Sequence, residues 1–118
     1  MKYLLLVCWD AEHQNADAEP TPSEKAARET EPFPWVDELR AKGTWLIGDQ
    51  LAAPRRGRTV RVRDGKRTVT DGPFAETKEA VGGFDLLECD SLEEAIEIAA
   101  AHPVAEIGTI EVRPLWGN

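Results

Sequence analysis

The stretch that decides the fold is residues 71–84, DGPFAETKEAVGGF, which joins a predicted hairpin to the most strand-like run of the chain. Gly72 can adopt a positive φ angle, and Pro73 fixes its own φ and restricts the residue before it. Phe74 offers a large apolar side chain as an anchor. We therefore expect a rigid corner that holds the Asp71 carboxylate in one place.

Outward from this corner, the apolar pattern predicts four main strands, a hairpin and two helices. The main strands are expected over residues 2–9, 45–51, 83–90 and 108–115, the hairpin strands over 59–63 and 67–70, and the helices over 22–42 and 91–101. Capping boxes, Thr21 with Glu24 and Ser91 with Glu94, support both helix starts. Residues 10–19 are polar without periodicity and are expected to form a loop. The order β-α-β-hairpin-β-α-β is a split βαβ arrangement.

The first predicted helix contains a fault, because an interior proline removes a backbone hydrogen bond and clashes with the preceding turn. Pro32 and Pro34 predict a break near residues 31–34. Beyond the break, Trp35 and Leu39 recur at helical spacing and are expected to face the sheet.

The run 71–84 resembles the DGPF branch of the YCII-related proteins. Three more segments agree with it in the expected order: MKYLLL at 1–6, DSLEEA at 90–95 and IEVRPL at 110–115. The resemblance implies one domain over residues 1–118, with a ferredoxin-like α+β fold that pairs into a dimeric α/β barrel. Such proteins resemble small enzymes and ligand-binding proteins of that superfamily.

The apolar residues of the strands give the homodimer a physical basis. The apolar strand residues in question are Leu4, Leu6, Phe84, Leu86, Ile110 and Val112. Two helices cannot cover all six side chains, so the uncovered face of the sheet is expected to pair with a second copy.

Composition excludes several classes of partner. A net charge of −8 argues against binding to nucleic acid or to anionic membranes. The longest apolar run near the N-terminus, residues 3–9, is too short for a membrane span and lacks a cleavage-site pattern, so we expect a cytoplasmic protein. Cys8 and Cys89 form no disulfide framework and are expected to be reduced, although they could lie close together. We find no phosphate-binding glycine loop and no metal-ligand spacing, so no cofactor or metal is expected.

Asp71 and His102 are the residues expected to carry acid–base chemistry. The family is often suspected of using a His-Asp pair whose histidine lies in the first helix, but residues 22–42 contain no histidine. The pair proposed here is therefore a substitute for it. Two structural alternatives remain open: Asp71 as a turn former and His102 as a capping residue.

Ligand-binding residues are expected beside the corner and on the wall of a pocket. Glu76 and Lys78 follow Phe74 on a loop that a rigid scaffold would position, and Trp9 is a candidate apolar wall. The alternatives are a solvated run of charges for the loop and a core position for the tryptophan.

Residues 55–67 hold seven of the fourteen cations of the chain. Arg61 and Arg63 alternate with valines, which places the two arginines on one face. We expect this face to be a docking site for an acidic protein partner or an anionic ligand. The alternative is a solvated hairpin that discourages edge-to-edge association.

The leading hypothesis for function is binding of a small organic molecule with cofactor-free acid–base chemistry. The other is a non-catalytic interaction module, since DGPF proteins resemble accessory proteins of extracytoplasmic-function sigma factors.

Overall fold

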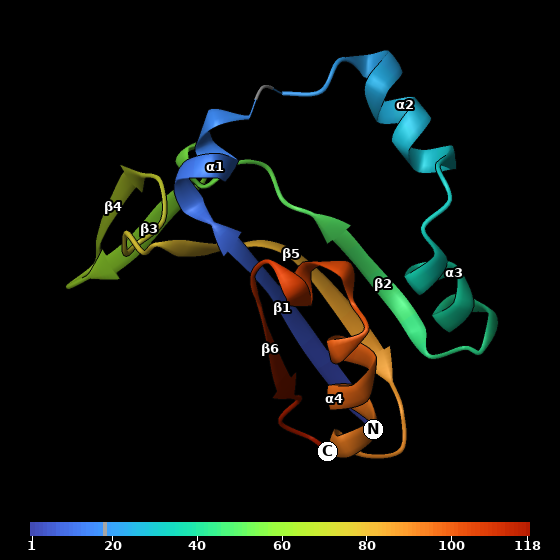
Figure 1. Cartoon of the computed structure of the whole chain (residues 1–118). Helices are drawn as coiled ribbons and strands as arrows, with labels where there is room; N and C mark the ends of the chain where they lie inside the picture. The colour runs from blue at the N-terminus through green and yellow to red at the C-terminus, as the bar shows by residue number, and fades with distance from the viewer. Residues whose placement is uncertain (18) are drawn as a thin grey trace.

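The computed structural model describes residues 1–17 and 19–118 and contains a four-stranded antiparallel sheet (Figure 1). Its strands, in the spatial order β2-β5-β1-β6, are β2 (Trp45–Gln50), β5 (Glu79–Glu88), β1 (Lys2–Asp10) and β6 (Thr109–Pro114). The helices are α1 (Ala11–Ala16), α2 (Pro22–Thr30), α3 (Pro34–Ala41) and α4 (Leu92–Ala100), with short 3-10 turns η1 (Pro54–Arg56) and η2 (Pro103–Glu106). A separate hairpin is formed by β3 (Arg58–Arg63) and β4 (Lys66–Asp71). This is the expected α+β fold, with the strand order of the ferredoxin-like arrangement.

Alternation along β1 and β5 divides the sheet into two faces. Leu5 and Leu87 are fully buried on the inner face, where they pack with residues of α3 and α4. Ile110 and Val112 lie on the same face, opposite Val7 and Leu5 in register. The other face, here called the open face, carries four half-buried apolar side chains on the two central strands. They are Leu4, Leu6, Phe84 and Leu86.

The break at the two prolines is confirmed. α2 ends at Thr30 and buries none of its residues, whereas α3 begins at Pro34 and buries Trp35, Val36 and Leu39. α3 ends where Gly43 takes a positive φ of 74°, the conformation that glycine adopts at little cost after a helix. None of the described helices is long and apolar enough to cross a membrane.

The loop expected over residues 10–19 is wrong, because residues 11–16 form α1. Asp10 caps this helix by accepting a hydrogen bond from the backbone N–H of His13 (2.7 Å). Gln14 is buried and donates to the carbonyl oxygens of Trp9 (3.0 Å) and Ala80 (2.9 Å). A buried amide with two backbone partners thus ties the helix to β1 and β5.

The hairpin expected around residues 64–66 is confirmed, but its turn has two residues, Asp64 and Gly65, because Lys66 already pairs with Arg63. Both turn residues have positive φ (52° and 74°), as a two-residue turn of primed type requires. The corner is confirmed at Gly72, with φ 80° and its N–H bonded to the carbonyl oxygen of Gly57 (2.8 Å). The expectation that Phe74 anchors this corner is wrong, because its side chain is 78% exposed. Backbone hydrogen bonds hold the corner instead.

The two cysteines are free thiols at opposite ends of the sheet. Cys8 lies opposite Val81, near the start of β5. Cys89 follows the end of β5 and donates its N–H to the carbonyl oxygen of Met1 (2.9 Å). The expectation that they could lie close together therefore fails, because the neighbouring strands run antiparallel.

Candidate functional site

A carboxylate on the inner face of the sheet is the first element of the site. Asp85 lies in β5 between apolar neighbours and is only 7% exposed. The indole Nε1 of Trp45, in β2, donates a hydrogen bond to its Oδ1 (2.8 Å). Gly48 lies opposite Asp85 in register, and a Cβ there would lie 2.5 Å from that same oxygen. The absence of a side chain at Gly48 thus makes room for the buried carboxylate.

The second element is His102, which is also 7% exposed and lies at the N-terminus of η2. Its Nδ1 accepts a hydrogen bond from the backbone N–H of Val104 (3.0 Å). In the neutral imidazole the ring proton must then sit on Nε2, since one nitrogen accepts and the other donates. Nε2 lies 3.9 Å from Oδ2 of Asp85.

Aromatic rings enclose the histidine on the side of α3. The ring of Trp35 meets the imidazole edge-on, with centroids 4.6 Å apart, and Phe33 approaches it at 6.0 Å. Trp35 is held in place because its Nε1 donates to the carbonyl oxygen of Ile98 in α4 (2.9 Å). The pair of titratable groups therefore lies between the sheet and an apolar wall.

Burial governs the protonation of both groups. It raises the pKa of Asp85 above its usual value, against the opposing effects of the Trp45 hydrogen bond and of His102. Burial lowers the pKa of His102, against the opposing effect of Asp85. Both shifts favour the uncharged form, so neither group behaves as a surface carboxylate or imidazole would.

The arrangement gives a hydrogen-bond donor and an acceptor that face each other without bonding. The separation of 3.9 Å between Nε2 and Oδ2 exceeds hydrogen-bond length. One oxygen atom placed about 2.8 Å from each would bridge them. Such an atom would accept from His102 and donate to Asp85, as a hydroxyl group or a water molecule does.

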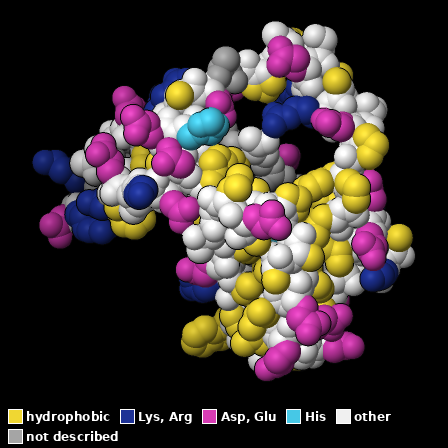
Figure 2. Space-filling view, viewed as in Figure 1, with side chains coloured by type: hydrophobic (Ala, Val, Ile, Leu, Met, Phe, Trp, Pro, Cys, Tyr) yellow, Lys and Arg dark blue, Asp and Glu magenta, His cyan; other side chains and the backbone are white. Residues whose placement is uncertain are grey.

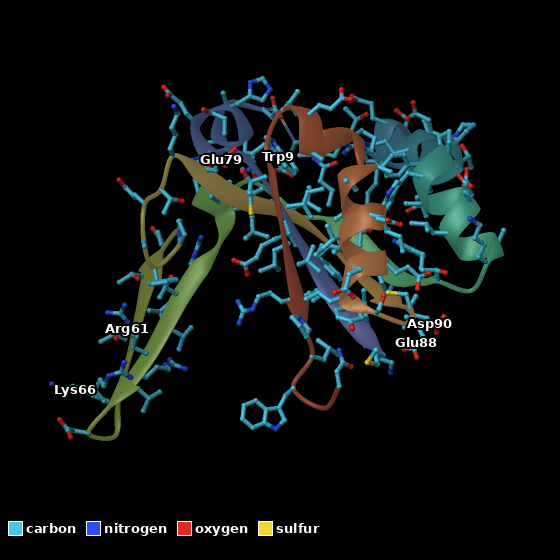
Figure 3. The ribbon with its side chains drawn as sticks, turned by 60° about the horizontal axis from the view of Figure 1, so that its bottom comes forward. Trp9, Arg61, Lys66, Glu79, Glu88 and Asp90 are labelled. Carbon is cyan, nitrogen blue, oxygen red and sulfur yellow. The ribbon has the colours of Figure 1, made fainter. Side chains whose placement is uncertain are left out.

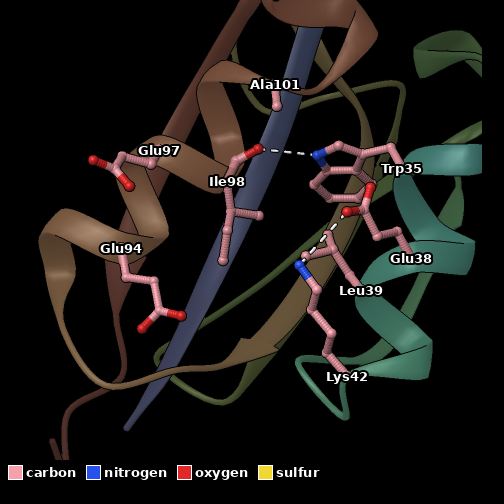
Figure 4. A pocket seen from close by; sticks show the side chains of 8 residues that line it. All are labelled: Trp35, Glu38, Leu39, Lys42, Glu94, Glu97, Ile98 and Ala101. Atoms are coloured by element: carbon pink, nitrogen blue, oxygen red, sulfur yellow. Dashed lines mark hydrogen bonds and ion pairs between the residues drawn. The ribbon is translucent and has the colours of Figure 1, made fainter.

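A groove opens at the surface between α3 and α4 (Figure 4). It has a volume of about 320 Å³, with an apolar floor and charged rims. The lining residues are Trp35, Glu38, Leu39, Lys42, Glu94, Glu97, Ile98 and Ala101. Trp35 belongs to both the groove and the wall around His102.

The structure does not bring together the two residues expected to act as a pair. Asp71 ends β4 on the hairpin, where its carboxylate is 88% exposed and lies 3.2 Å from Nε of Arg58. His102 is buried and faces Asp85. The carboxylate beside the histidine comes from the centre of β5, not from the corner that precedes this strand.

The residues expected to bind a ligand lie near the other end of β5. Phe74 and Glu76 are exposed, and Lys78 lines a hollow of about 650 Å³ together with Asp10, Thr77, Glu79 and Ile107. Trp9 is half-buried, and its ring lies over Gly82, where a Cβ would come within 2.3 Å. Lys78 is thus the expected ligand-binding residue that lines this hollow.

Asp85 was missed because an apolar strand was expected over residues 83–90 without regard to which face each residue takes. The sequence nevertheless indicates where Asp85 points. It is two and four residues from Leu87 and Cys89, so in a strand all three side chains lie on the same face. A carboxylate at an inward position of a buried strand is expensive unless it has a partner. That spacing, together with Gly48 on a neighbouring strand, could have indicated the site.

The stability of the protein should show a pH dependence that comes from this pair. Because the folded state lowers the pKa of His102, the unfolded state takes up a proton first, and stability is lost as pH falls below about 6.5. Because the folded state raises the pKa of Asp85, stability is lost as pH rises above about 4. The difference in unfolding free energy between wild type and Asp85→Asn/His102→Gln should therefore reach a minimum between these pH values. Urea unfolding of both proteins from pH 3.5 to 8 measures this difference. A difference that does not change with pH would contradict the assignment of Asp85 and His102 as a buried titrating pair.

Comparison with known proteins assigns the chain to a family. The sequence matches the YCII-related domain over residues 1–117. It is also similar to a protein of Rhizobium meliloti (strain 1021) that is described as uncharacterized, with 49% identity over 61 residues. That stretch covers 48% of this chain and 48% of the relative, so it spans about half the length of each. The family match confirms the resemblance drawn from residues 71–84, although the DGPF branch stays a prediction. The chain belongs to the YCII-related family.

Proposed function

We propose that the protein binds a small organic molecule at the Asp85–His102 pair and transfers a proton on it by acid–base chemistry of its own side chains. The observation that carries this proposal is the donor and acceptor 3.9 Å apart and nearly buried. His102, neutral because its Nδ1 accepts from the Val104 N–H, would donate a hydrogen bond through Nε2 to the ligand oxygen and stabilise negative charge there, while Asp85 takes up the proton and returns it. Asp85 would act as the acceptor, made more basic than an ordinary aspartate by burial.

The chemistry of the pair indicates a class of ligand. An oxygen that can both accept and donate a hydrogen bond fits the gap between Nε2 and Oδ2, as in an alcohol or the enol form of a carbonyl compound. Apolar atoms of the ligand would lie against Trp35, Leu39 and Ile98 on the floor of the groove. The ligand would reach the pair past the Trp35 indole, which lines the groove and contacts the ring of His102.

The experiment is a ligand screen with small hydroxy and keto compounds, read by changes in the NMR shifts of labelled indole N–H groups. Binding should perturb Nε1 of Trp35 and of Trp45, because each is bonded at the site. Asp85→Asn keeps the shape of the side chain and should reduce any turnover by about 10²–10⁴-fold. His102→Gln should do the same.

Asp71→Asn is the matched control, since it removes an exposed carboxylate that lies on the hairpin. It should leave binding and turnover unchanged. If Asp71→Asn abolishes binding while Asp85→Asn does not, the ligand site lies at the corner and the proposal fails. The proposal also fails if compounds bind to the protein without shifting the indole N–H signal of either Trp35 or Trp45.

We also propose that two copies pair through their open faces, as the dimeric α/β barrel would require. α3 and α4 both pack against the inner face, so neither covers Leu4, Leu6, Phe84 or Leu86. Ile47, opposite Leu86 in register, is 57% exposed, and Trp116 near the end of β6 is fully exposed. Apolar surface of this kind marks an interaction site in soluble proteins.

Leu86→Asp should dissociate this homodimer, because it places a carboxylate at the centre of the paired faces. We expect the dissociation constant to rise by at least about 100-fold. Sedimentation velocity over a range of concentrations measures this change. A wild-type protein that remains monomeric at every concentration would refute the homodimer.

A further inference from the structure

We propose that the basic arm, defined as residues 55–71, docks on the acidic end of a second copy of this chain. The acidic end comprises Glu88, Asp90, Glu93 and Glu97, at the end of β5 and on α4. This inference rests on the homodimer proposed above and assigns a second contact to it.

The basic arm has two different faces, and both are exposed. Register pairs Val60 with Val69 and Val62 with Arg67, so the three valines lie on one face beside Arg67, while Arg61 and Arg63 lie on the other face with Lys66. The valines Val60, Val62 and Val69 are 59%, 58% and 52% exposed. A two-stranded hairpin is marginally stable alone in water, and three exposed β-branched side chains favour a partner that offers apolar surface.

The charge of the arm is opposite to that of the rest of the chain. Residues 55–71 contain seven cations and two carboxylates, a formal charge of +5. Since the whole chain carries −8, the remaining residues carry −13. Figure 2 shows the Lys and Arg side chains of the arm at the left of the molecule and a group of carboxylates at its lower end. Opposite potentials of this kind steer two proteins together and fix their orientation.

Most cations of the arm are available to a partner. Arg56 pairs with Glu19 (2.8 Å) and Arg58 with Asp71 (3.2 Å), both at the base of the hairpin. The cations nearer the tip form no ion pair within residues 1–17 and 19–118. They are Arg61, Arg63, Lys66 and Arg67.

The acidic end is equally unoccupied. Glu88 lies beside the N-terminal amino group (3.1 Å), but Asp90, Glu93 and Glu97 have no cationic partner in the described part of the chain. All four side chains are exposed. Glu88 has the same parity as Leu86, so it borders the open face.

The arm and the acidic end lie at opposite ends of the molecule (Figure 3). Arg61 and Lys66 are at one end, and Glu88 and Asp90 are at the other. β5 connects the two ends with ten residues, which span about 30 Å. In a two-fold dimer whose copies run in opposite directions, each arm would meet the acidic end of the other copy, and the contact would occur twice.

A second copy fits the arm better than a nucleic acid does. Phosphates would neutralise the arginines but leave the three valines exposed. The second copy offers carboxylates at Glu88 and Asp90 beside the apolar side chains of its open face. Its body also carries the charge of −13 that attracts the arm, and the same charge would repel nucleic acid.

The test uses two variants with reversed charges, Arg61→Glu/Arg63→Glu in the arm and Glu88→Lys/Asp90→Lys in the acidic end. Each variant alone should dimerise at least about tenfold more weakly, because like charges then meet at both contacts. An equimolar mixture of the two variants should form heterodimers with the wild-type affinity. In the heterodimer the reversed arm of one variant faces the reversed acidic end of the other, and the native arm faces the native acidic end, so opposite charges meet at both contacts. Sedimentation velocity at 50 and 500 mM salt, with one variant fluorescently labelled, measures homodimers and heterodimers separately. Lys25→Glu/Lys42→Glu, with the same change in charge but outside the arm, is the control.

Recovery in the mixture, with salt weakening the wild-type dimer, would support the proposal. If both variants dimerise as wild type does, the arm contact is refuted while the open-face homodimer stands. If wild type is monomeric at all concentrations, the homodimer itself fails and the arm contact with it. If Arg61→Glu/Arg63→Glu leaves dimerisation unchanged but abolishes binding to a mixed-sequence DNA duplex, the arm binds nucleic acid and the proposal is overturned.

Discussion

Gly48→Ala is expected to lower the free energy of unfolding by about 3 kcal/mol, a large effect for the addition of one methyl group. The new Cβ would lie 2.5 Å from Oδ1 of Asp85 and 2.5 Å from the carbonyl oxygen of Phe84. The second contact is with backbone that belongs to the ladder between β2 and β5, so it cannot be relieved by turning a side chain. Chemical denaturation followed by tryptophan fluorescence measures the loss.

The control for this substitution is Gly117→Ala, because a Cβ at Gly117 meets nothing within 4 Å. It should change the unfolding free energy by less than about 0.5 kcal/mol. The site adds a second readout, since Gly48→Ala should displace the Asp85 carboxylate from Trp45 and shift the indole N–H signal of that residue. A loss below about 1 kcal/mol would show that β2 can move away from β5, contrary to the packing described.

Leu87→Ala is expected to lower the free energy of unfolding by about 2–5 kcal/mol, through lost burial and the cavity that remains. Leu87 is fully buried and packs with Leu5, Trp35 and Leu39 in the core beneath α3. The measurement is urea denaturation at a protein concentration where the oligomeric state is known. If the proposed homodimer forms, its dissociation constant for the folded variant should stay within about threefold of wild type, because Leu87 does not face the open side.

The adjacent residue provides a matched control with the opposite pattern. Leu86→Ala removes the same atoms from the half-buried open face. It should cost a folded monomer less unfolding free energy than Leu87→Ala but weaken the dimer. If both substitutions have equal effects on stability and neither changes dimerisation, the distinction between the two faces is wrong.

Local signals in the sequence predicted most of the fold because they act over a few residues. Pro32 and Pro34 break the first helical segment whatever the surroundings are. The turn at Asp64 and Gly65 requires only that both residues take positive φ. The short helix α1 was missed because its stability depends on the distant carbonyl oxygen of Ala80, to which Gln14 donates.

The candidate site could be predicted only in part because Asp85 and His102 lie on different elements, β5 and the start of η2, and meet only in the folded domain. His102 was found as a lone imidazole at the end of a helix, but its partner could not be read from nearby residues. Asp85 lies on the inner face of β5, and His102 meets it from the start of η2, between α4 and β6. Asp71 was preferred because its corner has a recognisable turn chemistry. Turn chemistry fixes the backbone and says little about where the carboxylate points, and the structure shows it in solvent beside Arg58.

Because α2 buries none of its residues, the fold should tolerate cleavage of the backbone within this helix. β1 is hydrogen-bonded to β5 on one side and to β6 on the other, and β2 is bonded to β5. The segment that carries α2 joins β1 to the rest of the chain without contributing a strand or a core side chain. Cleavage of the backbone within α2 would therefore break no hydrogen bond between strands. The N-terminal fragment would remain bound to the C-terminal fragment, because its strand β1 lies between β5 and β6. The domain is thus organised as two pieces that complement each other, linked by a covalent tether outside the core.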